Sequence, residues 1–431
     1  MPSRSAFTLS KKSFRLEELL QLAASFNNCQ LLDSNGYKDK YSQFNWLLGW
    51  GAQAEIQSSQ QSFAKLRNFK EEHKDWLLGH LAYPLKDETE NLNSRKSDFL
   101  NWPHLAFFVP ETIIIAKDDS LICQSYKYHN AAQLQADLSQ TITPSHSRHP
   151  KFEASLSKDK YLEHISALKD ELQAGNIYEI NFCQAWYAQE EINPLHLFLE
   201  LNRKHQAPFS SFYRLEDRYL LCFSPERYLQ KQGRKLISQP IKGTAPRAQS
   251  EKEDTERKLG LLASEKERAE NVMIVDLVRN DLSRTAAKAS VKVEELFGLY
   301  SFNAVHQMIS TISSQLAAQY DLIDALETSF PMGSMTGAPK ISAMQLIDRH
   351  ENFNRGLYSG SVGYISPEGN ADFNVIIRSI LYSYQLKRAE VKVGGAITIH
   401  CNAEEEYEEC LLKAEKVIAY SNDWKASGPA A

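Results

Sequence analysis

The chain has 431 residues, of which 42% are hydrophobic and 24% are charged, the composition of an average globular protein and not of a disordered one. This length is enough for roughly three domains of average size or for one large fold. The formal net charge is −5, so the chain lacks the excess of positive charge that binding to nucleic acid or to an anionic membrane requires. We therefore expect neither partner.

Six cysteines are spread along the chain and none forms a C-x-x-C pair, so the sequence predicts neither a disulfide framework nor a structural zinc site. The N-terminal residues lack the apolar core of a signal peptide, and no stretch contains the roughly eighteen apolar residues that span a bilayer. We expect a cytoplasmic protein with reduced thiols.

The first third of the chain alternates short apolar runs with turns, which is typical of strands with a few helices. The runs occupy residues 45–50, 75–85 and 104–116. A polar stretch with two prolines follows at 139–160 and is interpreted as a connection. The sequence thus predicts an N-terminal region at 1–140 and a C-terminal region at 155–420, intertwined in one globule.

Beyond residue 160, helical and β patterns are mixed, which predicts an α+β fold. A helix is predicted over 255–283, with one apolar stripe. The stripe consists of Leu262, Ala269, Met273 and Leu277. A second helix is predicted over 403–420, and a third is expected to begin at Pro339, since proline suits a first helical turn. The β-branched and aromatic residues of 373–386 predict a strand.

Two pairs of carboxylates lie on the predicted helices. Glu267 and Glu270 are three residues apart on the first helix, and each pair projects from one side of its helix. Glu406 and Glu409 repeat the spacing on the second. Two facing pairs could hold a hard cation such as Mg²⁺. Since most such pairs are solvated surface residues, the spacing alone leaves both interpretations open.

Two glycine-containing segments could bind an anion. Gly333, Gly337 and Pro339 precede a predicted helix, where free backbone N–H groups attract negative charge. The segment 394–396 follows a strand-like VKV and allows close approach of the backbone. An ordinary turn is the simpler explanation of either segment alone. Neither matches a phosphate loop or a dinucleotide fingerprint, so no nucleotide cofactor is predicted.

Four further side chains are candidates for chemistry. Arg378 interrupts an apolar strand and needs a carboxylate partner, from the protein or from a ligand. Lys242 lies between a proline and a glycine, either as a solvated turn residue or as a nucleophile. His306 is flanked by apolar residues, which more often indicates a hydrogen-bonded core histidine. Glu226 ends an apolar run, where burial would raise its pKa towards that of a proton donor.

The order of nine sequence blocks is more specific than any of these signals. The blocks are GNIYEINFCQ (175–184), FSPERYL (223–229), QPIKGTAPR (239–247), KERAENVMIVDLVRNDLSR (266–284), AVHQMIST (304–311), MGSMTGAPK (332–340), YSGSVGYIS (358–366), VIIRSIL (375–381) and AEEEYEECLLKAEKV (403–417). In this order the chain resembles the chorismate-utilising enzymes from about Tyr161 to Ala419, with a weaker match upstream. The resemblance implies a four-layer α/β/β/α sandwich of two antiparallel sheets covered by helices, with an active-site cleft at one end.

The resemblance also implies a Mg²⁺ site and a substrate site. Glu270 and Glu409, together with Glu267 and Glu406, resemble the family's Mg²⁺ ligands. In the family this metal holds the ring carboxylate of chorismate. Residues implied in substrate binding are Ser334, Tyr358, Arg378, Gly394, Gly395, Ala396, Lys413, Gly243 and Thr244. Among these, Arg378 and Tyr358 resemble the clamp on the enolpyruvyl carboxylate.

Three residues take catalytic roles in this resemblance. His306 lies beside the reacting ring, and Glu226 is the acid that protonates the departing C4 hydroxyl. Lys242 separates the branches of the family, because anthranilate and isochorismate synthases carry alanine there and aminodeoxychorismate synthases carry lysine. A lysine amine that attacks C2 can be displaced when ammonia attacks C4, which leaves nitrogen at C4. Lys242 must be neutral to attack, so we expect burial or nearby positive charge to lower its pKa.

Three residues depart from the family pattern. Glu179 stands where isochorismate and salicylate synthases carry a water-activating lysine, and where the amine-forming enzymes more often carry glutamine. A carboxylate there counts against water addition, and its own effect is left open. Ala396 replaces a frequent glycine in a glycine-rich turn, and His400 replaces a frequent aspartate. The alternative to the lysine-dependent branch is an anthranilate synthase component.

Partners follow from the same resemblance. The sequence shows no glutaminase motif such as G-x-C-x-G, and free ammonia is scarce at neutral pH, so a separate glutamine amidotransferase subunit is expected to supply it. The product would serve 4-aminobenzoate and folate synthesis. Residues 31–34, LLDS, are similar to part of a tryptophan feedback site in anthranilate synthase. Core packing is the simplest interpretation of this segment, with a relic or a structural tryptophan pocket as alternatives.

Overall fold

The computed structural model describes residues 3–90, 92, 96–139, 149–303 and 305–418. In this part of the chain, twenty strands form one continuous antiparallel network that bends into two sheets at two long strands, β3 (Trp46–Ser58) and β5 (Leu105–Lys117). The first half of β5 pairs with one sheet and its second half with the other. The two sheets therefore share a common spine.

The first sheet begins with an edge strand near the N-terminus and ends beside β8. Its spatial order is β1 (Ser5–Thr8), β6 (Ser120–Ser125), β5, β3, β2 (Asn28–Asp33), β9 (Phe209–Leu215), β10 (Arg218–Ser224), β19 (Ser379–Ser383), β20 (Arg388–Ile397) and β8 (Glu179–Gln189). Two short strands, β7 (Glu153–Ala154) and β16 (Gly337–Ala338), also pair with β8.

The second sheet continues from the other half of β5. Its order is β4 (Leu77–Leu81), β17 (Ser361–Ile365), β18 (Ala371–Asn374), β11 (Arg227–Gln232), β12 (Lys235–Gln239), β15 (Val305–Gln315) and β14 (Lys292–Ser301). The strand β13 (Ile241–Pro246) comes after β12 and also pairs with β15. The register between β13 and β15 shifts between Ile241 and Thr244. Such irregularities re-aim side chains next to functional sites.

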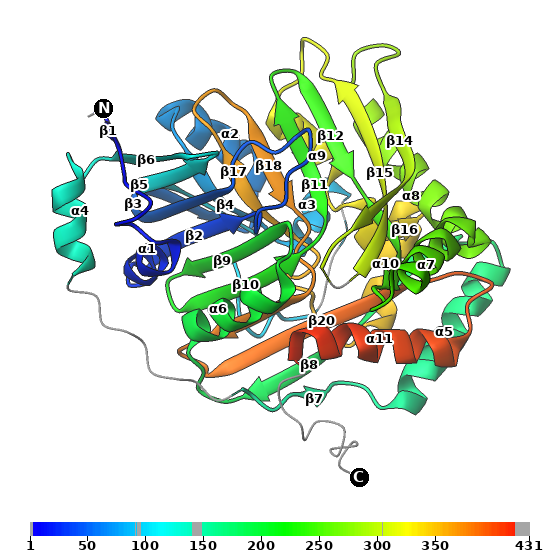
Figure 1. Ribbon diagram of the computed structural model, residues 1–431. Coiled ribbons are helices and arrows are strands. Elements are labelled where there is room, and N and C mark those ends of the chain that lie inside the picture. The colour runs from blue at the N-terminus through cyan, green and yellow to red at the C-terminus, as the bar shows by residue number, and fades with distance from the viewer. Residues whose placement is uncertain (1–2, 91, 93–95, 140–148, 304, 419–431) are drawn as a thin grey trace.

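Helices cover the outer faces of both sheets (Figure 1). On the first sheet lie α1 (Leu16–Ala23), α4 (Ala131–Leu138), α6 (Pro194–His205) and α11 (Ala403–Ile418). On the second lie α2 (Ser62–His73), α7 (Glu251–Ala263), α8 (Glu265–Ser283) and α9 (Leu322–Ser329). Around the start of β8 pack α5 (Lys158–Gln173) and α10 (Lys340–His350), and a short α3 (Lys86–Thr89) follows β4. The predicted α/β/β/α sandwich is confirmed.

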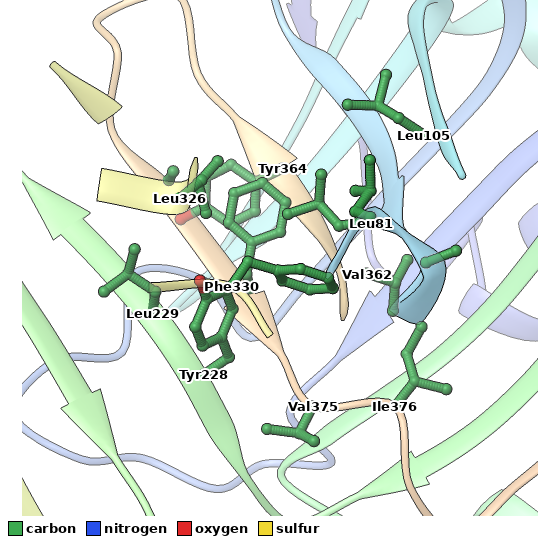
Figure 2. Packing of buried hydrophobic residues seen from close by; sticks show 14 of the residues in the cluster. Leu81, Leu105, Tyr228, Leu229, Leu326, Phe330, Val362, Tyr364, Val375 and Ile376 are labelled. Carbon is green, nitrogen blue, oxygen red and sulfur yellow. The ribbon is translucent and has the colours of Figure 1, made fainter. Parts of the chain in front are cut away.

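Buried apolar side chains of the second sheet, such as Leu229 and Tyr364, belong to one cluster with Leu326 of α9 (Figure 2). Tyr228 and Phe330 meet edge to face with ring centroids 6.1 Å apart, an arrangement that aromatic pairs favour. The hydroxyl of Tyr228 shares a hydrogen bond of 2.6 Å with Ser329, which satisfies the one polar atom that the ring buries. These contacts join β11, which follows Glu226, to the end of α9 and the segment after it.

The predicted helix over 255–283 is wrong in two respects. The structure has two helices, α7 and α8, separated at Ser264, whose side chain accepts a hydrogen bond from the Glu267 N–H and so caps α8. The predicted apolar stripe is also displaced, because Ala269 is exposed and Met273 only half-buried. The buried apolar residues of α8 are Ile274, Val275, Val278 and Leu282. A helix facing a twisted sheet and a second helix buries more than one stripe.

Two strand predictions also need correction. The predicted strand over 373–386 is interrupted after β18, since Arg378 has a left-handed φ of 49° and β19 begins only after it. The glycine-rich segment 394–396 was expected in a turn, but it lies inside β20 and pairs with β8. The predicted helices are better placed: α11 covers most of 403–420, and Pro339 immediately precedes α10.

Strands of the N-terminal and C-terminal regions pair directly. β2 pairs with β9, and β4 pairs with β17. The polar stretch 139–160 lies partly outside the described residues, and its end contains β7 and the start of α5. None of the helices that the structure describes is long and apolar enough to cross a membrane.

Candidate active site

The candidate residues gather where α8, β13, β16 and the start of β8 meet, with α10 and α7 close by (Figure 1). Lys242, on β13, lies at the centre. Its side chain is 9% exposed and its Nζ donates to Oε1 of Glu179 at 2.5 Å. The fold brings β13 close to the start of β8, so these two residues meet although 63 positions separate them in the sequence.

The expectation of a lowered pKa for Lys242 is wrong for this structure. Burial lowers the pKa, but the carboxylates of Glu179 and Glu270 outweigh it and leave the pKa raised. Lys242 is therefore an ammonium paired with a carboxylate. Its attack on a substrate requires a nearby group that accepts a proton.

Glu226 precedes β11 and has the environment of a proton donor. Its side chain is buried, and burial raises its pKa to about 7, although Ser334, Lys242 and Arg378 act in the opposite direction. The hydroxyl of Ser334 donates to Oε1 of Glu226 at 2.7 Å. Ser334 lies in a 3₁₀ turn, Gly333–Met335. The structure therefore brings together three residues that the resemblance had grouped: Lys242, Glu226 and Ser334.

The four predicted metal-ligating carboxylates come from two helices distant in sequence. Glu267 and Glu270 project from α8. Burial raises the pKa of Glu270 to about 7, and burial followed by the charge of Glu409 on α11 raises the pKa of Glu267. The two helices thus present their carboxylates to one another. Such mutual repulsion in a buried site favours a cation.

Lysines hold two of these carboxylates. Lys266 donates to Oε1 of Glu406 at 3.0 Å, and Lys413 lies 2.8 Å from Oε1 of Glu409. Burial raises the pKa of Glu406, whereas Lys413 and Lys266 overcome burial and lower the pKa of Glu409. Within the described ranges, no three His, Cys, Asp or Glu side chains are arranged to hold a metal ion.

The donor set nevertheless fits a hard cation. Oε1 of Glu270 is buried and has no hydrogen-bond partner in the part of the chain that the structure describes. A buried carboxylate oxygen without a partner is costly, and oxygen donors are those that Mg²⁺ prefers. Gly243, with φ of 89°, allows Glu267 to approach, since a Cβ there would lie 2.9 Å from its Oε2.

Arg378 presents a guanidinium that none of the described residues pairs with. Burial lowers its pKa, and Glu226 opposes that shift. The sequence left open whether its carboxylate partner belongs to the protein or to a ligand; no protein carboxylate of the described chain takes that place. A bidentate guanidinium is suited to a carboxylate ligand.

The thiol of Cys183 lies close to both Tyr358 and Gly394 of β20. The thiol of Cys183 is 3.9 Å from the Tyr358 hydroxyl, and a Cβ at Gly394 would lie 2.4 Å from its Sγ. Gly395 faces α11, since a Cβ there would lie 3.1 Å from Oε2 of Glu406. These glycines let β20 approach both β8 and α11, and the next residue, Ala396, pairs with β8.

His306 lies on β15 and is engaged on both ring nitrogens. Nδ1 shares a hydrogen bond of 2.9 Å with Ser301, and Nε2 shares one of 3.0 Å with Asp254 of α7. No hydrogen bond joins it to Lys242 or Glu226 within the described residues. His306 thus has the contacts of a hydrogen-bonded core histidine. Thr244 is exposed on β13 and pairs in register with Gln307, the residue after His306.

Residues 31–34 contribute to a separate pocket. Leu31 is buried in the core of the first sheet, as the packing interpretation expected. Leu32, Asp33 and Ser34 instead line a pocket of about 610 Å³, part of which is open to solvent. Packing therefore explains Leu31 and, in part, Leu32, which also contacts the core between the sheets, but not the two polar residues.

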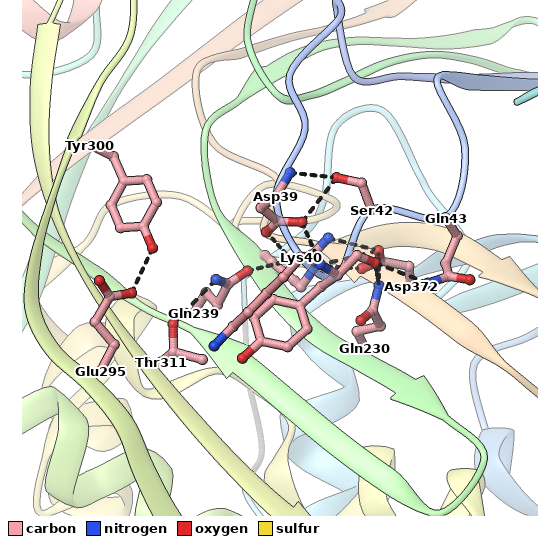
Figure 3. A network of polar contacts seen from close by, with 12 residues as sticks. Asp39, Lys40, Ser42, Gln43, Gln230, Gln239, Glu295, Tyr300, Thr311 and Asp372 are labelled. Atoms are coloured by element: carbon pink, nitrogen blue, oxygen red, sulfur yellow. Dashed lines mark hydrogen bonds and ion pairs between the residues drawn. The ribbon is translucent and has the colours of Figure 1, made fainter. Parts of the chain in front are cut away.

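One wall of this pocket includes Arg227 and Asp372, which belong to a network of polar contacts, and Figure 3 shows the part of it around Asp372. Arg227 forms ion pairs of 3.0 Å with Asp39 and with Asp372. Gln230 donates to Asp372 at 2.8 Å. Because each charge in the network has a partner, this arginine has a structural explanation that Arg378 lacks.

Comparison with known proteins identifies the family. A family model described as chorismate binding enzyme matches residues 27–419. The chain belongs to the chorismate-binding enzyme family. The match includes every residue discussed above for the candidate active site.

Relatives in this family carry two names. The chain is 39% identical over 267 residues to aminodeoxychorismate synthase component 1 of Escherichia coli, a match that spans 62% of this chain and 58% of that protein. The Salmonella typhimurium protein of the same name is 34% identical, over 79% of this chain and 75% of that protein. Anthranilate synthase component 1 of Saccharolobus solfataricus is 30% identical, over 91% of this chain and 93% of that protein.

A solved structure has the same fold. Anthranilate synthase component I of Streptococcus pneumoniae superposes with a TM-score of 0.77 at 23% identity, over 89% of this chain and 93% of that one.

The structure also shows contacts that the sequence did not predict. Neither the Lys242–Glu179 pair nor the contact of Lys266 with Glu406 has a local sequence signal, because their partners lie on different elements.

Proposed function

We propose that this protein is the chorismate-binding component of an aminodeoxychorismate synthase. It would convert chorismate and ammonia to 4-amino-4-deoxychorismate, for 4-aminobenzoate and folate synthesis, with ammonia supplied by a separate glutamine amidotransferase subunit. The observation that carries the proposal is the buried amine of Lys242 in contact with one carboxylate and close to the raised-pKa acid Glu226. Relatives named aminodeoxychorismate synthase component 1 support it.

The roles of the residues follow from their chemistry. The unpaired guanidinium of Arg378 would bind a substrate carboxylate. Mg²⁺, held by Glu267, Glu270, Glu406 and Glu409, would neutralise those carboxylates and hold the ring carboxylate of chorismate. Lys242 would supply the nucleophile and Glu226 the proton for the leaving hydroxyl.

The proposed reaction has two displacements. First, Nζ of Lys242 bonds to C2, the two ring double bonds shift, and the C4–O bond breaks, so the hydroxyl leaves as water with the proton of Glu226. Ammonia then bonds to C4, the double bonds shift back, and the C2–Nζ bond breaks. Nitrogen remains at C4 and the lysine is regenerated.

The test is the product of one reaction. The protein incubated with chorismate, Mg²⁺ and ammonium should form 4-amino-4-deoxychorismate, identified by mass spectrometry and NMR. We expect Lys242→Ala to lower C4 amination by about 10³-fold or more, as loss of a covalent nucleophile does, or to move nitrogen to C2. Lys235→Ala is the matched control, because Lys235 lies on the neighbouring strand β12 and pairs with Glu294 at the surface.

An anthranilate synthase component is the second candidate, supported by the relative that matches 91% of this chain. It would use the same carboxylates and the same acid but attack C2 with ammonia and release pyruvate. Anthranilate as the product of the wild-type protein would refute the proposed function. A rate and product unchanged by Lys242→Ala would show that the lysine is not the nucleophile.

A further inference from the structure

Glu179 begins β8 at a fixed point of the backbone. It pairs in register with Ala338 of β16, and the N–H of its neighbour Tyr178 donates to the Ala338 carbonyl at 2.7 Å. Gly337 packs so closely that a Cβ there would lie 2.2 Å from the carbonyl oxygen of Glu179. The loop of residues 333–339 therefore determines the backbone position from which the Glu179 side chain projects.

The pair formed by Glu179 and Lys242 is incompletely satisfied. Glu179 is 1% exposed, and its Oε1 accepts from Lys242 while its Oε2 is buried without a hydrogen-bond partner among the described residues. Lys242 donates to no second acceptor in that part of the chain, although an ammonium can donate three hydrogen bonds. Stability alone does not favour such a buried pair.

Two other buried lysines are satisfied more fully. Lys392 donates to Glu390 at 2.7 Å and also to the carbonyl of Arg355 at 3.3 Å, and the second oxygen of Glu390 is 3.3 Å from Arg388. Lys340, too, has two acceptors, at 2.7 and 3.1 Å. Lys242 and Glu179 therefore keep donors and an acceptor oxygen unused, unlike these two lysines and their partners.

We propose that Glu179 is the base that takes a proton from Lys242 before attack and returns it when the amine departs, an inference that rests on the proposed function. The proton moves from Nζ to Oε1 along the existing hydrogen bond, and the neutral amine bonds to C2. When ammonia bonds to C4, the adduct nitrogen leaves C2 as a neutral amine and recovers the proton from Glu179. The new C4 ammonium gives one proton to Glu226, so all groups return to their starting states.

This assignment explains how a lysine with a raised pKa acts as a nucleophile. A lysine that must lose its proton to water needs a lowered pKa, whereas a base in contact with Nζ removes that requirement. Several other charged groups face Lys242 and contribute to its pH dependence. They are Glu270 and Glu267 of α8, Glu226 before β11 and Glu409 of α11.

The test is Glu179→Gln, which keeps the size of the side chain and an oxygen that accepts from Lys242 but cannot take its proton. Adduct formation is followed in single turnovers with chorismate and Mg²⁺ without ammonium, as the mass of chorismate less one water on Lys242. We expect this rate to fall by about tenfold or more at neutral pH, with KM for chorismate unchanged. The rate of the variant should climb as pH rises to about 7, because more Lys242 is neutral. Above that pH it should level off where the wild type declines, because loss of the Glu226 proton offsets the gain in neutral lysine. Glu390→Gln, which breaks a buried structural pair, should lower Tm without moving the pH profile.

Each outcome decides the inference. An adduct rate and pH profile of Glu179→Gln equal to those of the wild type would overturn it. If that variant does not fold, Glu179→Asp takes its place, and its shorter side chain should slow adduct formation with the same alkaline displacement; an unchanged profile overturns the inference. Wild-type protein that makes anthranilate, or forms no Lys242 adduct, contradicts the proposed function itself.

Discussion

At the scale of single residues, Glu226 is under two opposing influences. Burial favours its neutral form and raises its pKa to about 7, while the hydroxyl of Ser334 donates to its charged form and lowers the pKa. The pKa is therefore close to a neutral working pH, where a proton donor is most effective. The two residues are 108 positions apart, so the loop that carries Ser334 adjusts the acid.

The pH dependence of the reaction should report this acid. Glu226 must be protonated to donate, so we expect kcat to fall as pH rises through about 7. Glu226→Gln cannot donate a proton and should lower kcat by about 100-fold or more. Ser334→Ala removes the hydrogen bond that lowers the pKa, so its alkaline limb should move to higher pH. A limb that stays in place, or moves lower, would contradict this account of Ser334.

At the scale of elements, the loop before α10 positions both carboxylates around Lys242. Its 3₁₀ turn carries Ser334 to Glu226, and its short strand β16 pairs with Glu179. Gly337, with φ of 150°, occupies a conformation that favours glycine and lies against the β8 backbone. The sequence alone allowed an anion-binding role for this loop or an ordinary turn, whereas in the structure the loop supports two acidic side chains.

Replacement of Gly337 should therefore affect stability and catalysis together. In Gly337→Ala the new Cβ would meet the Glu179 carbonyl, and we expect a loss of about 1–3 kcal/mol or more with a fall in kcat. Gly175→Ala is the control, because Gly175 also has a positive φ, of 76°, but has no atom within 4 Å of the Cβ position. It should lose only about 1–2 kcal/mol of backbone strain. Thermal unfolding and kcat are measured for both variants. Equal losses in the two variants would contradict this role of Gly337.

At the scale of the whole molecule, the fold brings side chains of α8 and α11 together, and Lys266 of α8 donates to Glu406 of α11. Glu267 of α8 and Glu409 of α11 influence each other although they lie far apart in sequence. Burial holds the pKa of Glu270 at about 7, above the ordinary value of 4.5. A group with a raised folded-state pKa loses its stabilising contribution as pH rises through that value. Without a cation, the charged forms of Glu267 and Glu270 therefore destabilise the fold at neutral and alkaline pH, whereas Lys413 and Lys266 stabilise the charged form of Glu409.

Addition of Mg²⁺ should relieve that destabilisation. We expect Tm to rise with Mg²⁺ at pH 8, by an amount equivalent to about 2.7 kcal/mol when the concentration is a hundred times Kd, and a chelator to reverse the rise. Glu270→Gln and Glu409→Gln should abolish it. Glu404→Gln is the control, because Glu404 pairs with Lys158 on the exposed side of α11. An equal rise in all variants would place any bound Mg²⁺ elsewhere.

The architecture could be predicted from the sequence, and so could the burial of Glu226. Nine ordered blocks were enough for the two covered sheets, and the environment expected for Glu226 agrees with its buried, raised-pKa position. Predictions that depended on periodicity within one segment were less accurate. The break at Ser264 and the left-handed residue Arg378 interrupt segments that look continuous, because caps and neighbouring elements override local preference.

The sequence by itself determined the family and the kinds of donor and acid available, since these depend on residue identity and order. Only the tertiary structure decided how those groups are paired. It placed Glu179 against Lys242, left Arg378 without a protein carboxylate among the described residues, and surrounded His306 with hydrogen-bond partners. The physical reason is that charge and proton transfer depend on distances of a few ångströms between elements that sequence spacing does not specify.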